Sequence, residues 1–221
     1  MAGWEVFRSE GSASGFHGRA MAEVPTRRAD VLSVDAPALV LGSTQPEADA
    51  DHHALAAAGI ELVRRRSGGG AVLLRAEEVL WVDLDVPRDD ELWHDDVGRA
   101  FLWLGRAWVS ALADLGVAAD VHEGPLRSTR WSRQVCFAGL GPGEVTVDGA
   151  KVVGIAQRRT RAGARFQCAA LDRWEPSATT SLLHLGPAER ALADEELAGA
   201  AAGLGVGSAA LFDALLARLP V

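Results

Sequence analysis

Residues Arg64 to Val72 read Arg-Arg-Arg-Ser-Gly-Gly-Gly-Ala-Val, and this stretch determines how the rest of the chain is interpreted. It follows a short apolar run at residues 59–63 that is typical of a strand. Three successive glycines leave the turn without side chains, so the backbone can approach a ligand and its N–H groups can bind phosphate or carboxylate oxygens. The arginines add planar donors that suit phosphate. The stretch therefore predicts an anion-binding loop or, more simply, a tight turn beside a solvated basic segment.

The spacing of the glycines excludes two common nucleotide-binding motifs. Gly-x-Gly-x-x-Gly, which marks dinucleotide-binding folds, is absent, and no Gly-Lys-Ser/Thr follows the glycines as it does in a P-loop. Any nucleotide site here must therefore belong to another kind of fold.

A second segment, Val147 to Arg159, places a lysine in an apolar strand. Asp148-Gly149 between apolar runs is a strong hairpin signal, and Lys151 follows it among valine and isoleucine residues. An ammonium group in such a strand faces either a polar pocket or the solvent at a hairpin edge. Gly154 would let a ligand lie against the strand.

Together with an upstream segment, these two stretches resemble the lipoate–protein ligase and octanoyltransferase family, relatives of biotin–protein ligase. Residues Ala38 to Gln45 are similar to the family's apolar strand ending in Gly-x-x-Gln. The glycine stretch is similar to its Arg-Arg-x-Ser-Gly-Gly-Gly-Ala-Val signature, and the lysine segment to its Gly-x-Lys-x-x-Gly-x-Ala-Gln strand. Three motifs in order are far more specific than one, and the resemblance covers residues 36–172.

The resemblance implies a catalytic role for Lys151, which would neutralise and orient an acyl-adenylate. ATP with Mg²⁺ would activate lipoate or octanoate, and a lysine of a lipoyl-domain protein would accept the acyl group. No structural metal is expected, because the histidines lack the spacing of metal ligands. The residues implied to bind substrate or nucleotide are Arg64, Arg65, Ser67, Gly68, Gly69, Gly70, Ala71, Gly154, Gln157 and Arg159.

Cys136 supports an alternative within the family. It lies in an arginine-containing segment before Lys151, as in the cysteine-dependent octanoyltransferases that take an acyl group from acyl carrier protein through a cysteine thioester. An ordinary structural cysteine is the simpler interpretation of Cys136. Cys168 lies in a predicted strand and is expected to belong to the core.

The chain departs from the family pattern at two places. Leu74-Arg75 stands where ligases often carry His-Asp, and residues 1–30 lack the Asn-Met-Ala-x-Asp-Glu helix that helps cover the acyl group. A non-catalytic relative that binds an acyl-adenylate or a cofactor is therefore a third alternative. A biotin ligase fits the glycine and lysine motifs less well.

Composition excludes several other classes. A formal charge of −8 argues against general binding to nucleic acid or anionic membranes, and no apolar run approaches the roughly 18 residues of a membrane span. Two cysteines are too few for a disulfide framework, and the first ten residues lack a signal-peptide pattern, so a cytoplasmic location is expected.

The short C-terminal tail allows for a separate accessory protein as a further partner. A second basic run is interpreted as a dock for nucleotide phosphate or an acidic partner, or as a solvated hairpin tip; it comprises Arg158, Arg159, Arg161 and Arg165.

The element pattern agrees with the fold that the resemblance implies, an α+β fold with a mixed, largely antiparallel sheet and packed helices. A catalytic domain is predicted over residues 1–175 and a helical appendage over 176–221. Helices are predicted at 47–58, 90–115, 187–201 and 208–219, the second from apolar residues recurring every three and four positions. Strands are predicted at 31–42, 71–74, 79–86, 144–147, 151–159 and 165–171, and loops at 11–18 and 126–143.

Overall fold

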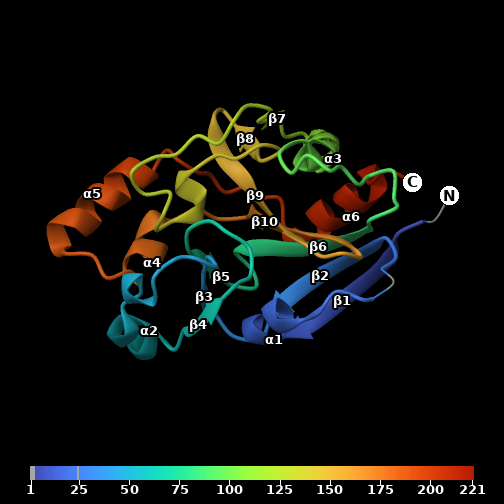
Figure 1. The fold of residues 1–221 in the computed structure, drawn as a ribbon. Helices are drawn as coiled ribbons and strands as arrows, with labels where there is room; N and C mark the ends of the chain where they lie inside the picture. The colour runs from blue at the N-terminus through green and yellow to red at the C-terminus, as the bar shows by residue number, and fades with distance from the viewer. Residues whose placement is uncertain (1–2, 24) are drawn as a thin grey trace.

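The computed structural model describes residues 3–23 and 25–221; Met1 and Ala2, at the start of the predicted catalytic domain, and Val24 lie outside the described residues. Over the described residues the chain forms a seven-stranded sheet and a three-stranded sheet, with helices packed around them (Figure 1). The predicted α+β class is confirmed.

The large sheet is antiparallel except for one pair at its edge, β1 with β2, which is parallel. Its strands lie in the order β1 (Glu5–Gly11), β2 (Arg28–Val34), β6 (Val79–Pro87), β10 (Gly163–Leu171), β9 (Ala150–Arg159), β8 (Val145–Val147) and β7 (Asp120–Val121). The small sheet has β3 (Ala38–Leu41) between β4 (Glu61–Arg64) and β5 (Val72–Leu74). The glycine loop therefore joins the two outer strands of the small sheet.

The helices gather in two groups (Figure 1). Helices α3 (Leu102–Asp114) and α6 (Ser208–Arg218) lie side by side on one face of the large sheet. Helices α2 (His52–Ala58), α4 (Pro176–Thr180) and α5 (Pro187–Leu197) lie near the small sheet, and α1 (Ala13–Gly18) lies by β2 and Trp81. No helix in the described residues is both long and apolar enough to cross a bilayer.

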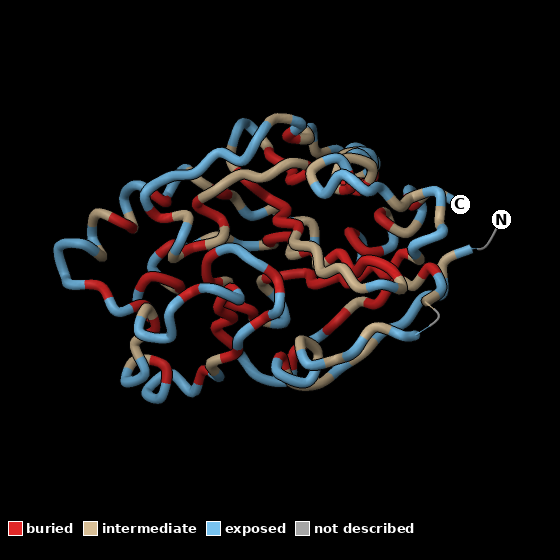
Figure 2. The backbone as a smooth tube through the Cα atoms, viewed as in Figure 1, coloured by how far each residue is buried: buried red, intermediate tan, exposed pale blue. Residues whose placement is uncertain are grey.

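The core of the large sheet is built on the side chains that point to one face of the central strand β6. Leu80, Val82, Leu84 and Val86 pack under α3 and α6, while Trp81, Asp83 and Asp85 alternate with them along the strand. Figure 2 shows the buried chain running through the middle strands, with exposed chain on the outer helices.

Residues 176–221 pack against the rest of the chain. Leu211, Phe212 and Leu215 of α6 belong to the core under the large sheet, and Ala193 and Leu197 of α5 belong to the core of the small one. The domain boundary at residue 175 stays a prediction.

The predicted helix at 90–115 is wrong in its first half. Only Leu102–Asp114 is α-helical, after a short 3-10 turn at Arg99–Phe101. The segment before it is held by side chains instead of a helix: Asp90 pairs with Arg27, and Asp96 accepts the N–H of Arg99. The helical spacing of apolar residues therefore begins before the first residue of the actual helix.

Three other local predictions also differ. The predicted loop at 11–18 contains α1, which Ser12 caps by accepting the N–H of Gly15. The predicted strand at 31–42 is two strands in different sheets, because Pro37 lies in the turn between them. The predicted helix at 47–58 is a 3-10 turn at Glu47–Asp49 followed by α2, which ends as expected at Gly59 with φ +65°.

Candidate functional site

Most of the candidate residues meet at one cavity of about 910 Å³. Its walls come largely from the glycine loop, from β9 and β10, and from the segment 126–143 that was predicted to be a loop. The candidates that line it are Arg65, Gly68, Gly69, Gly70, Cys136, Lys151, Gly154 and Gln157; the candidates outside the lining are Arg64, Ser67, Ala71 and Arg159.

The glycine loop has its shape because side chains are missing. Gly69 has φ +104°, which favours glycine, and a Cβ on Gly70 would lie 2.6 Å from the backbone nitrogen of Val135. A Cβ on Gly42 would lie 1.8 Å from the carbonyl oxygen of Gly69. The residue after β3 and the segment at residues 134–135 therefore approach the loop at positions that only glycine can fill.

Two of the three arginines before the loop donate hydrogen bonds to backbone carbonyl groups in and beside the loop. The buried Arg65 guanidinium donates to the carbonyl oxygens of Gly68 and Gly70, each at 2.8 Å, and of Val40 at 3.2 Å. Arg64 donates to the carbonyl oxygens of Gly42 and Gln45. Arg65 thus donates to the backbone of the glycine loop itself, and Arg64 donates to the backbone of the segment that follows β3.

The loop's own N–H groups are left for a ligand. Among hydrogen bonds of the described residues, none is donated by the backbone nitrogen of Gly68, Gly69 or Gly70. Three such donors beside a cavity form a site for phosphate or carboxylate oxygens. Ser67 and Ala71 flank them, with Ser67 donating to the Gln167 side chain and Ala71 to the carbonyl oxygen of Gln134.

Lys151 reaches the cavity from β9 although its side chain is only 3% exposed. Its Nζ lies 2.7 Å from Glu144 Oε2 and donates to the carbonyl oxygens of Cys136 at 3.2 Å and Gly139 at 3.0 Å. The ammonium also lies 5.0 Å from the centre of the Phe137 ring. All three of its N–H donors therefore have partners.

Glu144 is a site residue that the sequence reasoning missed. Its carboxylate accepts the N–H groups of Gly141 at 2.6 Å and Ile155 at 3.1 Å, in addition to the contact with Lys151. A glutamate entering an apolar strand just before the lysine hairpin was the available signal, because a buried carboxylate needs a cationic partner.

Cys136 and Cys168 have different surroundings. Cys136 is partly exposed, lines the cavity, and has its Sγ 3.9 Å from Nη2 of Arg65. Cys168 is fully buried in the core under the large sheet, and burial raises the pKa of its thiol to about 12. Cys168 therefore stays a protonated core residue.

The cavity has an apolar part and a polar rim. Val40, Val72, Leu74, Trp81 and Phe137 are among the apolar residues that line it. The rim is made by the exposed and partly exposed polar side chains Thr44, Ser128, Thr129, Arg130, Ser132, Arg133 and Gln134, whereas the polar Gln45 is buried. Apolar walls with some polar groups suit an amphipathic acid.

The second basic run does not form one surface. Arg165 is buried and forms a bidentate pair with Asp85 at 2.7 and 2.8 Å, while Arg159 stacks over Trp93 and donates to the carbonyl oxygens of His94 and Asp95. Only Arg161 in this run is classed as exposed. Arg165 therefore stabilises the sheet and offers no free donor fork to a partner.

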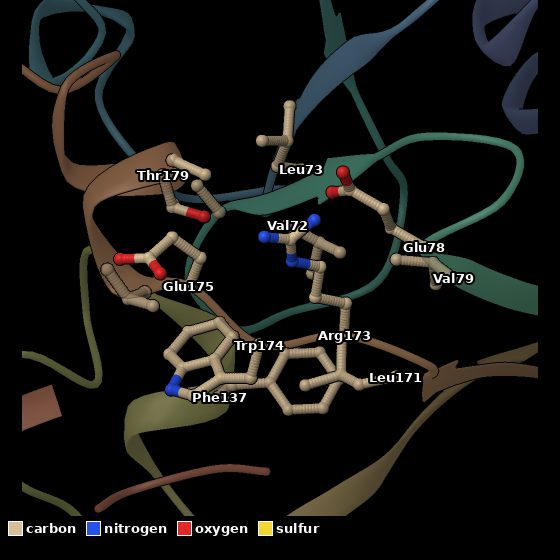
Figure 3. A pocket seen from close by; sticks show the side chains of 13 residues that line it. Val72, Leu73, Glu78, Val79, Phe137, Leu171, Arg173, Trp174, Glu175 and Thr179 are labelled. Atoms are coloured by element: carbon tan, nitrogen blue, oxygen red, sulfur yellow. The ribbon is translucent and has the colours of Figure 1, made fainter. Parts of the chain in front are cut away.

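A second, much smaller cavity of about 30 Å³ is shown in Figure 3. Phe137 and Val72 line both cavities and therefore lie between them. Figure 3 shows the Arg173 guanidinium between the side chains of Glu78 and Glu175. This volume holds about two water molecules, so the larger cavity is the candidate site.

No three metal-ligating side chains gather within residues 3–23 and 25–221. Of the histidines, His122 bonds the carbonyl oxygen of Pro125 through its ring, and His184 donates its backbone N–H to the carbonyl oxygen of Asp49.

A family model described as the lipoyl protein ligase A/B catalytic domain matches residues 21–195. No curated protein is significantly similar to the chain in sequence. The match of the family model includes the glycine loop, the lysine strand and the first C-terminal helices.

Several solved structures share the fold. A bi-partite lipoate protein ligase from Thermoplasma acidophilum aligns with a TM-score of 0.77 at 17% identity, over 99% of this chain and 82% of that chain. A lipoate-protein ligase A bound with ATP aligns with a TM-score of 0.74 at 19% identity, over 99% and 84%. LipL1 of P. falciparum, in complex with lipoate, aligns with a TM-score of 0.65 at 11% identity, over 98% and 61%.

Proposed function

This chain belongs to the lipoyl protein ligase A/B catalytic domain family, and we propose that it attaches a lipoyl or octanoyl group to a lysine of a lipoyl domain through an acyl-adenylate. One observation carries the proposal. A buried ammonium group, Lys151, and the free N–H groups of a glycine loop line the same cavity, whose remaining wall is largely apolar.

The acid would bind with its chain against the apolar wall and its carboxylate toward Lys151. A carboxylate oxygen would attack the α-phosphorus of ATP, forming the mixed anhydride and releasing pyrophosphate. The acceptor lysine amine would then attack the acyl carbonyl carbon, and AMP would leave as the amide forms. Negative charge builds on phosphate and carbonyl oxygens in both steps, and donors fixed in a dry cavity stabilise it.

Lys151 can supply that stabilisation without moving far. Glu144 holds the ammonium by charge, whereas the contacts to the carbonyl oxygens of Cys136 and Gly139 are ordinary hydrogen bonds that ligand oxygens can replace. Binding would therefore exchange two neutral acceptors for anionic ones.

The glycine loop and the rim suit the nucleotide. The N–H groups of Gly68 to Gly70 would take phosphate oxygens, and Arg130 and Arg133 at the rim would add positive charge. Mg²⁺ would accompany the phosphates. A structural relative is a lipoate-protein ligase A bound with ATP, and this supports ATP as a substrate here.

The acceptor would be a lipoyl domain. The Thermoplasma relative is described with its E2 lipoyl domain, which supports this partner. A separate accessory protein and a cytoplasmic location stay predictions from the sequence.

Cys136 favours a second candidate, an octanoyltransferase that needs no ATP. Its Sγ would attack the thioester carbon of octanoyl-acyl carrier protein, the carrier thiol would leave, and the acceptor lysine would take the acyl group from Cys136. The exposed part of the thiol and its place on the cavity wall support this route. A non-catalytic relative is the third candidate, in keeping with Leu74-Arg75, where Leu74 lines the cavity and Arg75 pairs with Glu78.

The three candidates are separated by supplying two acyl donors to the same acceptor. The purified protein and an apo lipoyl domain are incubated either with lipoate and Mg-ATP or with octanoyl-acyl carrier protein. The mass of the acceptor is then measured by intact mass spectrometry. Modification only with ATP establishes the ligase. Modification only from the carrier, with an octanoyl adduct on Cys136, establishes the transferase. No modification from either donor contradicts both enzymes.

A further inference from the structure

Glu196 of α5 joins the C-terminal part of the chain to the segment that forms one wall of the large cavity. Its Oε2 accepts a hydrogen bond from the indole N–H of Trp131 at 2.6 Å, and its Oε1 lies 3.4 Å from Nη1 of Arg130. The Arg130 guanidinium also lies over the Trp131 ring, 4.7 Å from its centre. One carboxylate therefore holds two successive residues of the segment that leads to Cys136.

Trp131 is the point at which an exposed stretch of chain returns to the interior. Residues 125–130 are all exposed, whereas Trp131 is 3% exposed and packs in the core of the small sheet. A buried indole needs an acceptor for its N–H, and Glu196 supplies it. Apolar packing thus buries the ring, and the hydrogen bond to Glu196 fixes its orientation.

From Trp131 the contacts continue to the glycine loop through a turn at residues 131–136. The carbonyl oxygen of Trp131 accepts the N–H groups of Gln134 and Val135. The carbonyl oxygen of Gln134 accepts the N–H of Ala71 at 2.8 Å, and that of Ala71 accepts the N–H of Cys136 at 3.0 Å. Because Ala71 directly follows the three glycines, this turn fixes one end of the loop.

The turn also touches the loop itself. A Cβ on Gly70 would lie 2.6 Å from the backbone nitrogen of Val135, so the two backbones are in direct contact. The N–H groups of Gly68 to Gly70 can bind one anion together only while the loop keeps its shape. A displacement of the turn would therefore disturb the donors that the loop offers.

We propose that Glu196 is a positioning residue for the glycine loop, because by holding the Trp131 indole it fixes the turn on which the loop rests. Loss of this support should weaken the binding of nucleotide more than the binding of the acid. The effect on the nucleotide rests on the proposed function, whereas the effect on the turn does not. On this inference α5 contributes to the site, although it lies in the segment that was predicted to be an appendage.

The first measurement is hydrogen exchange of the intact protein, followed by mass spectrometry. Glu196→Ala leaves the indole N–H without its acceptor, and Glu196→Gln keeps an acceptor oxygen. Glu195→Ala is the matched control, because Glu195 is exposed on the same helix and its side chain forms no hydrogen bond or ion pair within the described residues. Peptides over residues 129–138 and 67–74 report the turn and the loop, and a peptide over residues 163–171 reports β10.

In Glu196→Ala, exchange in the turn and loop peptides should be about tenfold faster than in the unmodified protein, with the β10 peptide unchanged. Glu196→Gln should restore most of the protection, and Glu195→Ala should match the unmodified protein. Equal exchange in Glu196→Ala and Glu195→Ala overturns the inference. Faster exchange that is equal in all three peptides also overturns it, because that result shows a general loss of stability.

The second measurement is the KM for ATP and for lipoate in the modification of an apo lipoyl domain. Glu196→Ala should raise the KM for ATP about tenfold and change kcat and the KM for lipoate by less than about twofold, and Glu196→Gln should lie near the unmodified protein. An unchanged KM for ATP, or an equal rise of both KM values, overturns the role toward the nucleotide. If the unmodified protein modifies no acceptor, the proposed function fails, and the exchange result alone decides whether Glu196 holds the turn.

Discussion

The ammonium group of Lys151 lies 2.7 Å from the carboxylate of Glu144, and both side chains are buried. The carboxylate is itself fixed by two backbone N–H groups, that of Gly141 on Oε2 and that of Ile155 on Oε1. The lysine is therefore held at one point on the cavity wall. This arrangement positions a charge, and positioning is what stabilisation of a developing anion needs.

Removing Glu144 alone should lower the free energy of unfolding much more than replacing both Glu144 and Lys151. Glu144→Ala leaves the Lys151 ammonium buried without its counter-charge, and we expect the free energy of unfolding to fall by about 3–5 kcal/mol. The double variant Glu144→Gln, Lys151→Met should recover most of that loss, since no unpaired charge remains. Urea denaturation measures both. An equal decrease in the free energy of unfolding in the single and double variants would show that an unpaired charge is not the cause of the destabilisation.

The glycine loop should tolerate alanine at Gly68 but not at Gly70. A Cβ on Gly70 would meet backbone atoms of Val135 and Gln134 below 3.0 Å, whereas a Cβ on Gly68 meets nothing within 4 Å. Gly70→Ala should therefore lose about 1–3 kcal/mol and lower Tm by about 5 °C, and Gly68→Ala should change Tm by much less. Differential scanning calorimetry compares them, and a similar Tm for the two variants would contradict the packing described.

Asp83 should give the fold a distinctive pH dependence. Burial is the largest influence on this carboxyl and raises its pKa to about 6, against the opposing effect of Arg165. Between pH 4 and pH 6 the folded protein thus holds more protons at this site than the unfolded chain, so the contribution of Asp83 to stability falls as pH rises through that window.

Asp83→Asn removes that titration. The difference in free energy of unfolding, variant minus unmodified protein, should therefore increase by about 2 kcal/mol from pH 4 to pH 7. Denaturant unfolding at several pH values measures this difference. Parallel pH profiles for the two proteins would show that the carboxyl titrates as an ordinary aspartate.

Cys136→Ser should leave ATP-dependent modification of a lipoyl domain within about twofold, because the adenylate route forms no bond to sulfur. The measurement is the initial rate of acceptor modification at saturating lipoate and Mg-ATP. A loss of a hundredfold or more with normal circular dichroism would instead point to a thioester on Cys136.

The residues that line the large cavity could be predicted from the sequence better than the bounds of the helices and strands around it. Gly68 to Gly70 and Lys151 could be singled out because consecutive glycines and a lysine in an apolar strand are unusual in themselves, and all four line the large cavity. Their roles were implied only by the family resemblance. Glu144 was missed, because a glutamate at the start of a strand gains its role only from the pairing of its carboxylate with Lys151 across the hairpin. Arg65 was identified as a site residue, but its donors point to the loop's carbonyl groups.

Errors in the secondary structure have the same origin. Trp93 and Val97 fit the apolar spacing of a helix, yet the ion pair of Asp90 with Arg27 holds their segment outside α3. The segment with α1 is small and polar like a loop, and it becomes helical where Phe16 and His17 pack on Trp81. Tertiary contacts override a weak local preference in both places.

The most direct test of the central claim is the intact mass of an apo lipoyl domain after incubation with this protein, lipoate and Mg-ATP. The account predicts a shift equal to one lipoyl group on one lysine, dependent on ATP and abolished by Lys151→Ala in a variant that still folds. An unshifted acceptor mass, or a shift that persists in Lys151→Ala, would contradict it.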